Sequence, residues 1–241
     1  MSGGIDRRRS LGFGAAAPAL VRALGELRTL WGRQGVVVGV PHGTFDAATD
    51  RIGARVARLT GAGALIATGF CAARTAGVRL NVNRPTEGAS RRVSEETSTG
   101  RAIAVHAAYL RRVRAAARGP LGLYLEVHGN SRPLTAARIE VATAGIDRRM
   151  ANRLKEATHR AVATLGEAAG VPLALSIEPV DALHLTASAA RRWPPFSEAR
   201  RALHVELPRA ARRRVAAEAA AAELIAVLLT VAEEGAEERN R

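Results

Sequence analysis

The sequence contains a single cysteine, Cys71, among its 241 residues. An internal disulfide and a cysteine-based zinc knuckle are therefore excluded, and a bound metal would need histidine and carboxylate ligands. Aromatic residues make up only 3% of the chain, so alanine, valine and leucine must fill the hydrophobic core. The sequence also lacks an uninterrupted run of about 18 apolar residues, the length that a membrane span requires. We therefore expect a cytoplasmic protein without a membrane span.

Lysine is almost absent as well, because Lys155 is the only one and arginine supplies nearly all of the positive charge. The formal net charge is +14, and the chain is rich in alanine and glycine. This combination is typical of a GC-rich genome, in which arginine replaces lysine on ordinary surfaces. No basic motif interleaved with aromatic residues accompanies the charge, so binding to nucleic acid is not expected.

Hydrophobic residues make up 47% of the chain and charged residues 24%, as in ordinary globular proteins. Short apolar runs alternate with longer stretches of helical periodicity, which predicts an α/β fold with a mixed, mostly parallel central sheet flanked by helices. The expected strands are residues 36–40, 64–68, 121–127, 138–142, 173–177 and 203–207, and the expected helices are 46–60, 101–118, 147–169 and 209–234.

We expect residues 1–241 to form one catalytic domain, with a flexible start at 1–15 and a frayed end at 235–241. The spacing of Leu20, Leu24, Leu27 and Trp31 predicts another helix near the N-terminus. Residues 74–100 are polar and lack a clear period, which predicts a long functional loop. Residues 181–200 form a second irregular segment, for which a lid or wall over a pocket and a packed surface loop are both open.

The first apolar run ends in a histidine. Residues 36–46 read Val-Val-Val-Gly-Val-Pro-His-Gly-Thr-Phe-Asp, so His42 lies at a strand end, where α/β sheets commonly bind ligands. Asp46 begins the next expected helix, where the helix dipole favours a carboxylate, and its side chain can turn back toward His42. Asp46 or Thr44 could instead serve only to cap that helix.

A second apolar run ends in the same way. Residues 121–130 read Leu-Gly-Leu-Tyr-Leu-Glu-Val-His-Gly-Asn, which places His128 at another strand end. Zinc in catalytic sites commonly takes three ligands of the His/His/carboxylate type and keeps a fourth position for water. Glu126 lies two residues before His128, so the two share one face of the strand, where the carboxylate can orient the imidazole.

Two further segments contribute a carboxylate and a guanidinium group. Glu206 lies among apolar neighbours in Ala-Leu-His-Val-Glu-Leu-Pro, where we expect desolvation to raise its pKa and suit it to proton transfer. Arg84 and Asn83 belong to Arg-Leu-Asn-Val-Asn-Arg-Pro, and together they suit the capture of a substrate carboxylate. His204, although it lies next to Glu206, has no recognisable partners in the sequence.

The order of these segments resembles the N-formylglutamate amidohydrolase family, which is related in fold to zinc carboxypeptidases and aspartoacylase-like deacylases. The resemblance spans about residues 36–208. Asn81 and Glu126 stand where that family has aspartate. The motifs that carry the resemblance are Pro41-His42-Gly43, Asn81-Val82-Asn83-Arg84, Glu126-Val127-His128 and the late strand with Glu206.

The resemblance implies a zinc-carboxypeptidase-like, three-layer fold. It also implies a zinc-dependent hydrolase that cleaves an amide bond of a small carboxylate-bearing substrate. The site residues that it implies are His42, Asp46 and His128 as zinc ligands, Glu206 as general base, and Arg84 with Asn83 as the clamp for the substrate carboxylate.

Several alternatives stay open. Asp50 lies one helical turn beyond Asp46 on nearly the same face and could replace it as the acidic ligand. A hydrolase of the same fold could act on a γ-glutamyl or cell-wall peptide. A chain that has lost its metal could instead use its basic surface to bind an acidic partner or nucleic acid.

Overall fold

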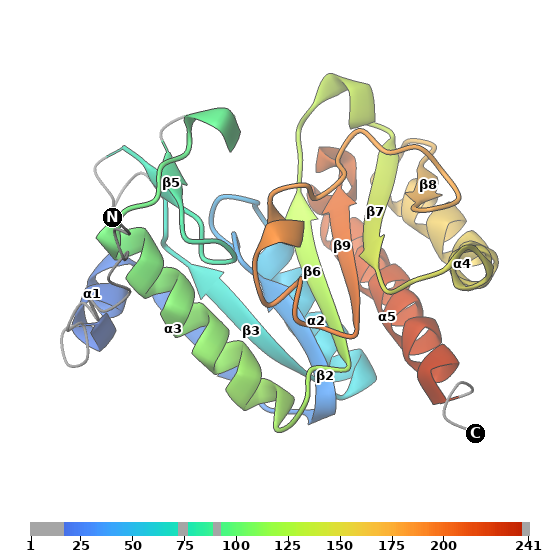
Figure 1. Ribbon diagram of the computed structural model, residues 1–241. Helices are drawn as coiled ribbons and strands as arrows, with labels where there is room; N and C mark the ends of the chain where they lie inside the picture. The colour runs from blue at the N-terminus through green and yellow to red at the C-terminus, as the bar shows by residue number, and fades with distance from the viewer. Residues whose placement is uncertain (1–16, 72–76, 89–92, 238–241) are drawn as a thin grey trace, which may run out of the picture.

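The structure is a computed structural model that describes residues 17–71, 77–88 and 93–237. Its centre is a seven-stranded sheet with the strand order β1-β3-β2-β6-β9-β7-β8 (Figure 1). Neighbours from β3 to β9 run parallel, whereas the pairs β1–β3 and β7–β9 are antiparallel. The predicted mixed, mostly parallel sheet is therefore confirmed. The strands are β1 (Glu26–Leu30), β2 (Arg33–Val40), β3 (Ala62–Thr68), β6 (Leu123–Gly129), β7 (Arg138–Ala144), β8 (Ala174–Ile177) and β9 (Arg201–Leu207).

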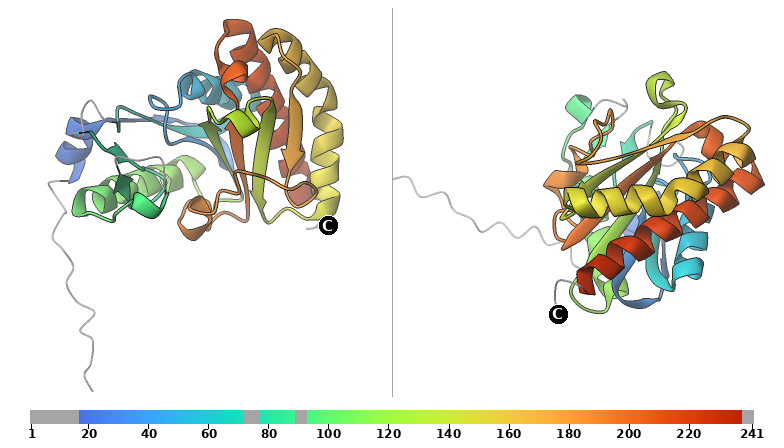
Figure 2. Two further views of the ribbon diagram at one scale, coloured as in Figure 1. Left: turned by 90° about the horizontal axis from the view of Figure 1, so that it is seen from above. Right: turned by 90° about the vertical axis from the view of Figure 1, so that its right-hand side faces the viewer.

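Helices cover both faces of this sheet and make a three-layer architecture, as predicted. Helices α2, α4 and α5 supply side chains to the larger hydrophobic cluster on one face. Helices α1 and α3 supply the cluster on the other face. Figure 2 shows α4 and α5 on the side of the sheet opposite to α3. The helices are α1 (Ala17–Leu24), α2 (Thr49–Thr60), α3 (Gly100–Ala117), α4 (Arg148–Ala169) and α5 (Val215–Glu237).

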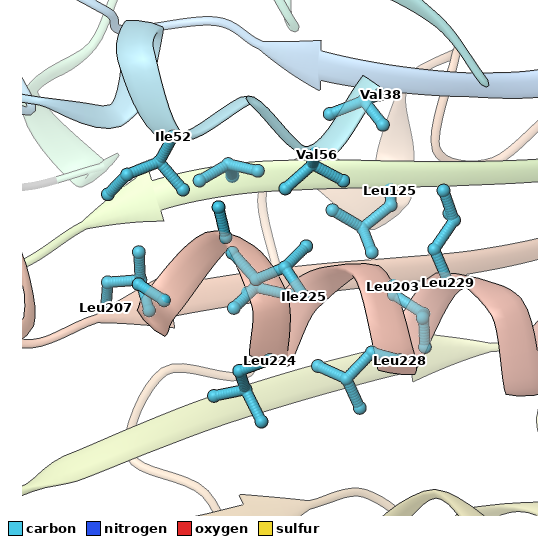
Figure 3. Close-up of a cluster of buried hydrophobic side chains, with 14 of the residues drawn as sticks. Val38, Ile52, Val56, Leu125, Leu203, Leu207, Leu224, Ile225, Leu228 and Leu229 are labelled. Atoms are coloured by element: carbon cyan, nitrogen blue, oxygen red, sulfur yellow. The ribbon is translucent and has the colours of Figure 1, made fainter. Parts of the chain in front are cut away.

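The larger core lies between α5 and the centre of the sheet (Figure 3). Leu228 and Ile225 of α5 are fully buried there and face strand residues such as Leu125. Strand side chains alternate between the two faces, so Val38 joins this core while the adjacent Val37 joins the opposite one. The larger core is aliphatic, as the low aromatic content predicts, whereas Phe70, Tyr109, Tyr124 and Phe196 join the aliphatic side chains of the smaller one.

Helix α5 is unusually apolar. Residues Val215–Glu234 have a mean hydropathy of 2.0, and by length and composition alone they could cross a membrane. Half of this stretch is buried inside the protein, where it packs against α2 and α4. The apolar composition thus has a role in the core, and this one helix is weak evidence for a membrane span.

The predicted N-terminal helix is wrong beyond Leu24. At Gly25 a side chain would meet the carbonyl oxygen of Thr68 at 2.5 Å, so the chain passes too close to β3 for a helical residue with a Cβ atom. The chain continues as the edge strand β1, which buries Leu27 against the sheet and leaves Trp31 beyond it 67% exposed. The apolar spacing fits a helix, but a strand forms there because β3 offers an unpaired edge.

Other boundaries also differ from prediction. Helix α2 begins at Thr49 rather than at residue 46, and a short 3-10 helix, Arg209–Arg212, precedes α5. The predicted loop 74–100 contains a small two-stranded sheet, β4 (Arg79–Leu80) with β5 (Glu87–Gly88), and a 3-10 turn, Val93–Glu95.

The two predicted flexible ends fall largely at the limits of the structure. Residues 1–15 lie outside the described residues, and so do residues 238–241. Helix α5 continues to Glu237, and the fraying of residues 235–241 stays a prediction.

The carboxyl ends of β2, β6 and β9 lie together at the upper edge of the sheet in Figure 1. The segment that contains β5 rises on the left of this edge, and the connection from β6 to β7 rises on the right. His42, His128 and Glu206 all belong to this edge, which is the position that the topology of an α/β sheet favours for a ligand site.

Truncation of the core side of α5 should destabilise the fold. We expect Leu228→Ala, at a fully buried position, to lower the free energy of unfolding by about 2–5 kcal/mol through lost burial and a residual cavity. Val215→Ala is the control in the same helix, because this side chain is 84% exposed and should change stability by no more than about 0.5 kcal/mol. Urea denaturation measures both, and equal effects of the two substitutions would contradict the core described here.

Candidate metal centre

The carboxyl ends of β2, β6 and β9 line an open pocket of about 760 Å³. Residues 184–190 form one wall of it, which is one of the two alternatives for the second irregular segment. Asn83 is the one predicted site residue that is not among the lining residues, and its side chain is buried below the pocket. The predicted site residues that do line the pocket are His42, Asp46, Arg84, His128 and Glu206.

The turn after β2 positions Asp46 without placing it in a helix. Its backbone N–H donates to the carbonyl of His42 at 2.7 Å, and its own carbonyl accepts the hydroxyl of Thr49 at 2.7 Å. Asp46 is not the N-cap of α2, because that position is Ala48, which makes no side-chain cap hydrogen bond. Instead, Oδ2 of Asp46 accepts the backbone N–H of Gly129 at 3.1 Å, which joins the ends of β2 and β6.

Asp46 also faces His128. Its Oδ2 lies 3.6 Å from Nδ1 of His128, which is too long for a hydrogen bond. Two ligand atoms bound to one tetrahedral zinc at about 2.0–2.2 Å lie roughly 3.4 Å apart, so this separation fits an ion between them. The rings of His42 and His128 lie 5.2 Å apart between centroids, edge to face. Asp50, the alternative acidic ligand, is not among the lining residues of the pocket.

Two histidines and two glutamates alternate on neighbouring strands. Strands β6 and β9 run parallel in a register that places Glu126 beside His204 and His128 beside Glu206. The i, i+2 spacing on each strand directs all four side chains to the same face. The imidazoles of His128 and His204 stack with their centroids 4.1 Å apart. Each imidazole therefore has carboxylates as neighbours along its own strand and across to the next.

Glu126 is the centre of this group and is fully buried. Its Oε2 accepts His128 Nε2 at 3.2 Å, His204 Nδ1 at 3.0 Å and the Asn83 amide at 3.3 Å. Its Oε1 accepts the Tyr124 hydroxyl at 3.0 Å. The hydrogen bond to Nε2 leaves Nδ1 of His128 to face the pocket, which is the orienting role predicted for Glu126.

A pair of buried tyrosines lies behind Glu126. The hydroxyls of Tyr109 and Tyr124 are 3.0 Å apart, and burial together with the charge of Glu126 raises the pKa of both well above the usual value. Both hydroxyls therefore stay protonated and available as donors. Gly39 of β2 makes room for them, because a Cβ atom there would lie 2.7 Å from the Tyr109 hydroxyl oxygen.

His204 is the residue that sequence reasoning missed. It has two carboxylate neighbours, Glu126 and Glu206, and the distance from its Nε2 to Oε1 of Glu206 is 3.3 Å. The available signal was the repetition of an acid and a histidine two residues apart, Glu126 with His128 and His204 with Glu206, in two expected strands. The pairing of those strands, which is not visible in the sequence, completes the group.

His42 and His128, two of the histidines that line the pocket, differ in protonation. Burial, followed by the charges of His128, Arg79 and Arg84, holds the pKa of His42 well below its usual value, so this imidazole is neutral and available as a metal ligand. Burial alone would lower the pKa of His128 too. Its ion pairs with Asp46 and Glu126 and the charge of Glu206 outweigh burial and raise the pKa to about 10.

The expectation of a raised pKa for Glu206 is wrong. Burial acts in that direction, but the hydrogen bond from His204 and the positive charges of His128, His204 and Arg132 outweigh it and lower the pKa. Glu206 is therefore an ionised carboxylate at the pocket, which is the form that a general base requires. Glu126 behaves alike, since its imidazole partners hold its pKa far below the usual range despite complete burial.

Two overlapping groups of side chains fit the chemistry of a zinc ligand set. One is Glu126, His128 and His204, which are buried and whose potential ligand atoms all lie within 4.8 Å of one another. Hydrogen bonds already join Glu126 to both imidazoles, and Glu126 does not line the pocket, although His128 and His204 do. The other is the predicted group of His42, Asp46 and His128, which lines the pocket and leaves it accessible.

Arg84 lines the pocket beside this centre, but its guanidinium already has a carboxylate partner. Its Nε and one terminal nitrogen donate to Glu96 at 2.8 and 2.5 Å, and another reaches the Asn83 side-chain oxygen at 3.4 Å. Arg79 donates to the same carboxylate at 3.1 Å and lies over the ring of Phe45. Two guanidiniums that share one carboxylate keep a net positive charge on this side of the pocket.

Arg212 connects the three chain segments that carry the predicted metal ligands and base. Its guanidinium donates to the carbonyls of Leu207, Ala47 and Asn130 at 3.2, 2.7 and 3.0 Å. These carbonyls follow Glu206, Asp46 and His128 in the chain by one or two residues. The group packs on Gly129, where a Cβ atom would lie 2.6 Å from the Arg212 Nε. Arg212 thus positions the site.

No family model matches this sequence, and no curated protein matches it either. Solved structures do match its fold. A gene product of Agrobacterium tumefaciens superposes with a TM-score of 0.50 at 12% identity, over 88% of this chain and 96% of that chain. A bacteriophage poly-gamma-glutamate hydrolase gives a TM-score of 0.45 at 11% identity, over 89% and 91% of the two chains.

A metallo-carboxypeptidase from Burkholderia cenocepacia gives a TM-score of 0.41 at 13% identity, over 91% of this chain and 68% of that chain. At such identities a likeness reports on the fold and not on the activity. The function of this chain must therefore be argued from the site itself.

Loss of the Arg212 guanidinium should loosen the site. We expect Arg212→Met to lower the free energy of unfolding by about 1–3 kcal/mol, because three carbonyl groups lose a charged donor. Arg213→Met is the matched control at the next position, which is exposed and should change stability by less than about 0.5 kcal/mol. Urea denaturation of both variants measures the difference, and an unaffected Arg212 variant would rule out the connecting role.

The raised pKa of His128 predicts a pH dependence of the metal-free protein. The protonated imidazole contributes stability that is complete below about pH 6.5, the unfolded value, and is lost as the pH rises through about 10. We therefore expect the free energy of unfolding, measured in chelator, to fall from pH 6.5 to 10 more steeply in wild type than in His128→Gln. His159→Gln, an exposed control, should keep the wild-type slope, and parallel curves for all three proteins would refute this assignment.

Proposed function

We propose that this chain is a zinc-dependent hydrolase that cleaves an amide bond of a small, carboxylate-bearing substrate, in the manner of the N-formylglutamate amidohydrolase family that its motifs resemble. The observation that carries the proposal is the convergence of His42, Asp46 and His128 on one open pocket with the ionised Glu206. Neutral imidazole and carboxylate are the donors that catalytic zinc sites use. The cytoplasmic location stays a prediction.

In this proposal, neighbouring groups hold, orient or keep neutral each of the three metal ligands. Asp46 is held by the backbone N–H of Gly129, and His128 is oriented by Glu126 behind it. His42 is neutral because burial and nearby positive charges disfavour its protonated form. His128 must lose a proton when it binds a metal, so metal binding should release protons near neutral pH.

A zinc ion bound by these three residues would lower the pKa of a bound water and polarise the scissile carbonyl. Glu206 is the base: its Oε1 is held by His204, and its Oε2 is left to accept the proton of the attacking water. The hydroxyl group adds to the acyl carbon, the carbon–nitrogen bond breaks, and Glu206 returns the proton to the leaving nitrogen. A carboxylic acid and an amine result.

Arg84 is the proposed partner of the substrate carboxylate on the leaving amine. Its bond to Glu96 fixes the plane of the guanidinium, and Asn83 below it contacts both Arg84 and Glu126. Asn83 thus links the substrate clamp to the carboxylate that orients His128. Precise placement of the amide over the centre is what such a clamp contributes to the rate.

Metal analysis and activity assays test this proposal together. We expect one zinc per chain, lost in His42→Ala and Asp46→Ala but kept in Asp50→Ala, the matched control one helical turn away. Glu206→Gln should keep its zinc and lose about 10²–10⁴-fold in kcat for the hydrolysis of N-acyl glutamates.

Three results would count against the proposal. Zinc binding that depends on His204 and Glu126 but not on His42 would assign the metal to the group of Glu126, His128 and His204. Hydrolysis of γ-glutamyl or cell-wall peptides alone would favour that substrate class. A protein without zinc that binds DNA in a salt-sensitive way after the loss of His42 and His128 would be a nucleic-acid binding protein.

A further inference from the structure

A group of three arginines lines the side of the pocket opposite to Arg84. Arg132 follows β6, and Arg209 and Arg213 belong to or directly follow the 3-10 helix after β9. All three are exposed. In the part of the chain that the structure describes, none of them forms an ion pair, whereas Arg84 on the other side has Glu96 as its partner.

The two arginine-bearing sides are separated by the proposed metal centre. Arg84 lies in the segment around β4 and β5, at the upper left of Figure 1, and Arg132 lies in the connection from β6 to β7, at the upper right. Between them are the ends of β2 and β6, which carry His42 and His128. A substrate with its amide bond at the metal would therefore extend toward both sides.

The charge of the pocket is strongly unbalanced. Its acidic lining residues are Asp46 and Glu206, and a bound metal would add further positive charge. Unpaired guanidiniums around a concave surface attract anions and orient carboxylates through their fork of donors. The arginines that line the pocket are Arg79, Arg84, Arg132, Arg209, Arg212 and Arg213.

The pocket is also larger than a one-carbon acyl group needs. Pockets of roughly 300–1,000 Å³ hold ligands of drug size, and this one has about 760 Å³. A formyl group at the metal would leave the side with Arg132 and Arg209 filled by water. A longer acyl group would reach these guanidiniums.

We propose that Arg132, Arg209 and Arg213 form a second anion-binding subsite, which holds a carboxylate on the acyl side of the scissile bond. This inference rests on the proposed amide hydrolysis and narrows its substrate class. The substrates are N-acyl amino acids or short peptides with an acidic group on each side of the amide bond. Arg84 binds the acid on the amine side, and the arginine group binds the acid on the acyl side.

A pair of compounds that differ in one charge tests the subsite. N-glutaryl-L-glutamate carries a carboxylate at the end of its acyl chain, and N-glutaramoyl-L-glutamate carries a neutral amide of nearly the same shape. For the zinc-loaded wild type we expect at least a tenfold higher kcat/KM for the glutaryl compound, about the effect of one charge-assisted hydrogen bond. A third substrate is the dipeptide γ-glutamylglutamate. Its kcat/KM, compared with that of the glutaryl compound, shows whether the acyl-side carboxylate belongs to an acidic peptide or to a dicarboxylic acyl group.

Substitution of the three arginines should remove this preference. In Arg132→Gln/Arg209→Gln/Arg213→Gln the kcat/KM ratio of the two compounds should fall to about 1, because the ratio cancels effects common to both. Arg160→Gln, an exposed position on α4 outside the pocket, should keep the wild-type ratio. The single variants Arg132→Gln and Arg209→Gln serve if the triple variant does not fold.

Binding measurements separate this inference from the proposed activity. Calorimetry should show that wild type binds the glutaryl compound at least tenfold more tightly than the glutaramoyl compound, and that the triple variant does not discriminate. If binding discriminates but neither compound is hydrolysed, the subsite stands and the amidase proposal fails. If both compounds are hydrolysed and bound equally well by wild type, the subsite is wrong and the amidase proposal stands.

Discussion

The buried carboxylate of Glu126 is the constraint on which the site depends. A charge in the middle of a sheet with no exposure to water is costly unless hydrogen bonds compensate it. Here four side chains donate to it, and two of them are the imidazoles of His128 and His204. The same bonds fix the orientation of His128, with Nε2 toward Glu126 and Nδ1 toward the pocket and Asp46.

The groups that compensate the charge of Glu126 come from several segments of the fold. Tyr124 reaches Glu126 only because Gly39 on the neighbouring strand has no side chain, and Asn83 reaches it from the segment that also carries Arg84. On the other side of the site, Arg212 joins the ends of β6 and β9 to the turn that carries Asp46. Two of the proposed ligands thus lie in the turn after β2 and the third lies in β6, and buried polar contacts hold the site on both sides.

Much of this arrangement could be predicted from the sequence, because local patterns encode it. Apolar runs marked six of the seven strands of the central sheet, and a histidine followed by glycine at the end of two of them marked the pocket edge. The role of His204 could not be predicted, because its neighbour Glu126 is 78 residues away and only the register of β6 and β9 brings them together. Strand β1 was missed for a related reason, since a free edge of the sheet overrides the helical spacing.

The pKa of Glu206 is another property that could not be predicted from the local sequence. Its apolar sequence neighbours predict a raised pKa, whereas His204 on the same strand, together with His128 and Arg132 from β6 and the segment after it, lowers it. Electrostatics of this kind depends on tertiary contacts that no local pattern reports. The roles of His42, Asp46 and His128 as metal ligands stay predictions, and the structure places all three residues at the same pocket.

The position of a bound ion tests the central claim most directly. Crystals of the zinc-loaded protein, measured on both sides of the zinc absorption edge, would locate the metal by its anomalous signal. The account predicts one peak at the pocket, about 2.0–2.2 Å from ligand atoms of His42, Asp46 and His128, with Glu126 outside the coordination sphere. A peak coordinated by Glu126 and His204 instead would contradict it.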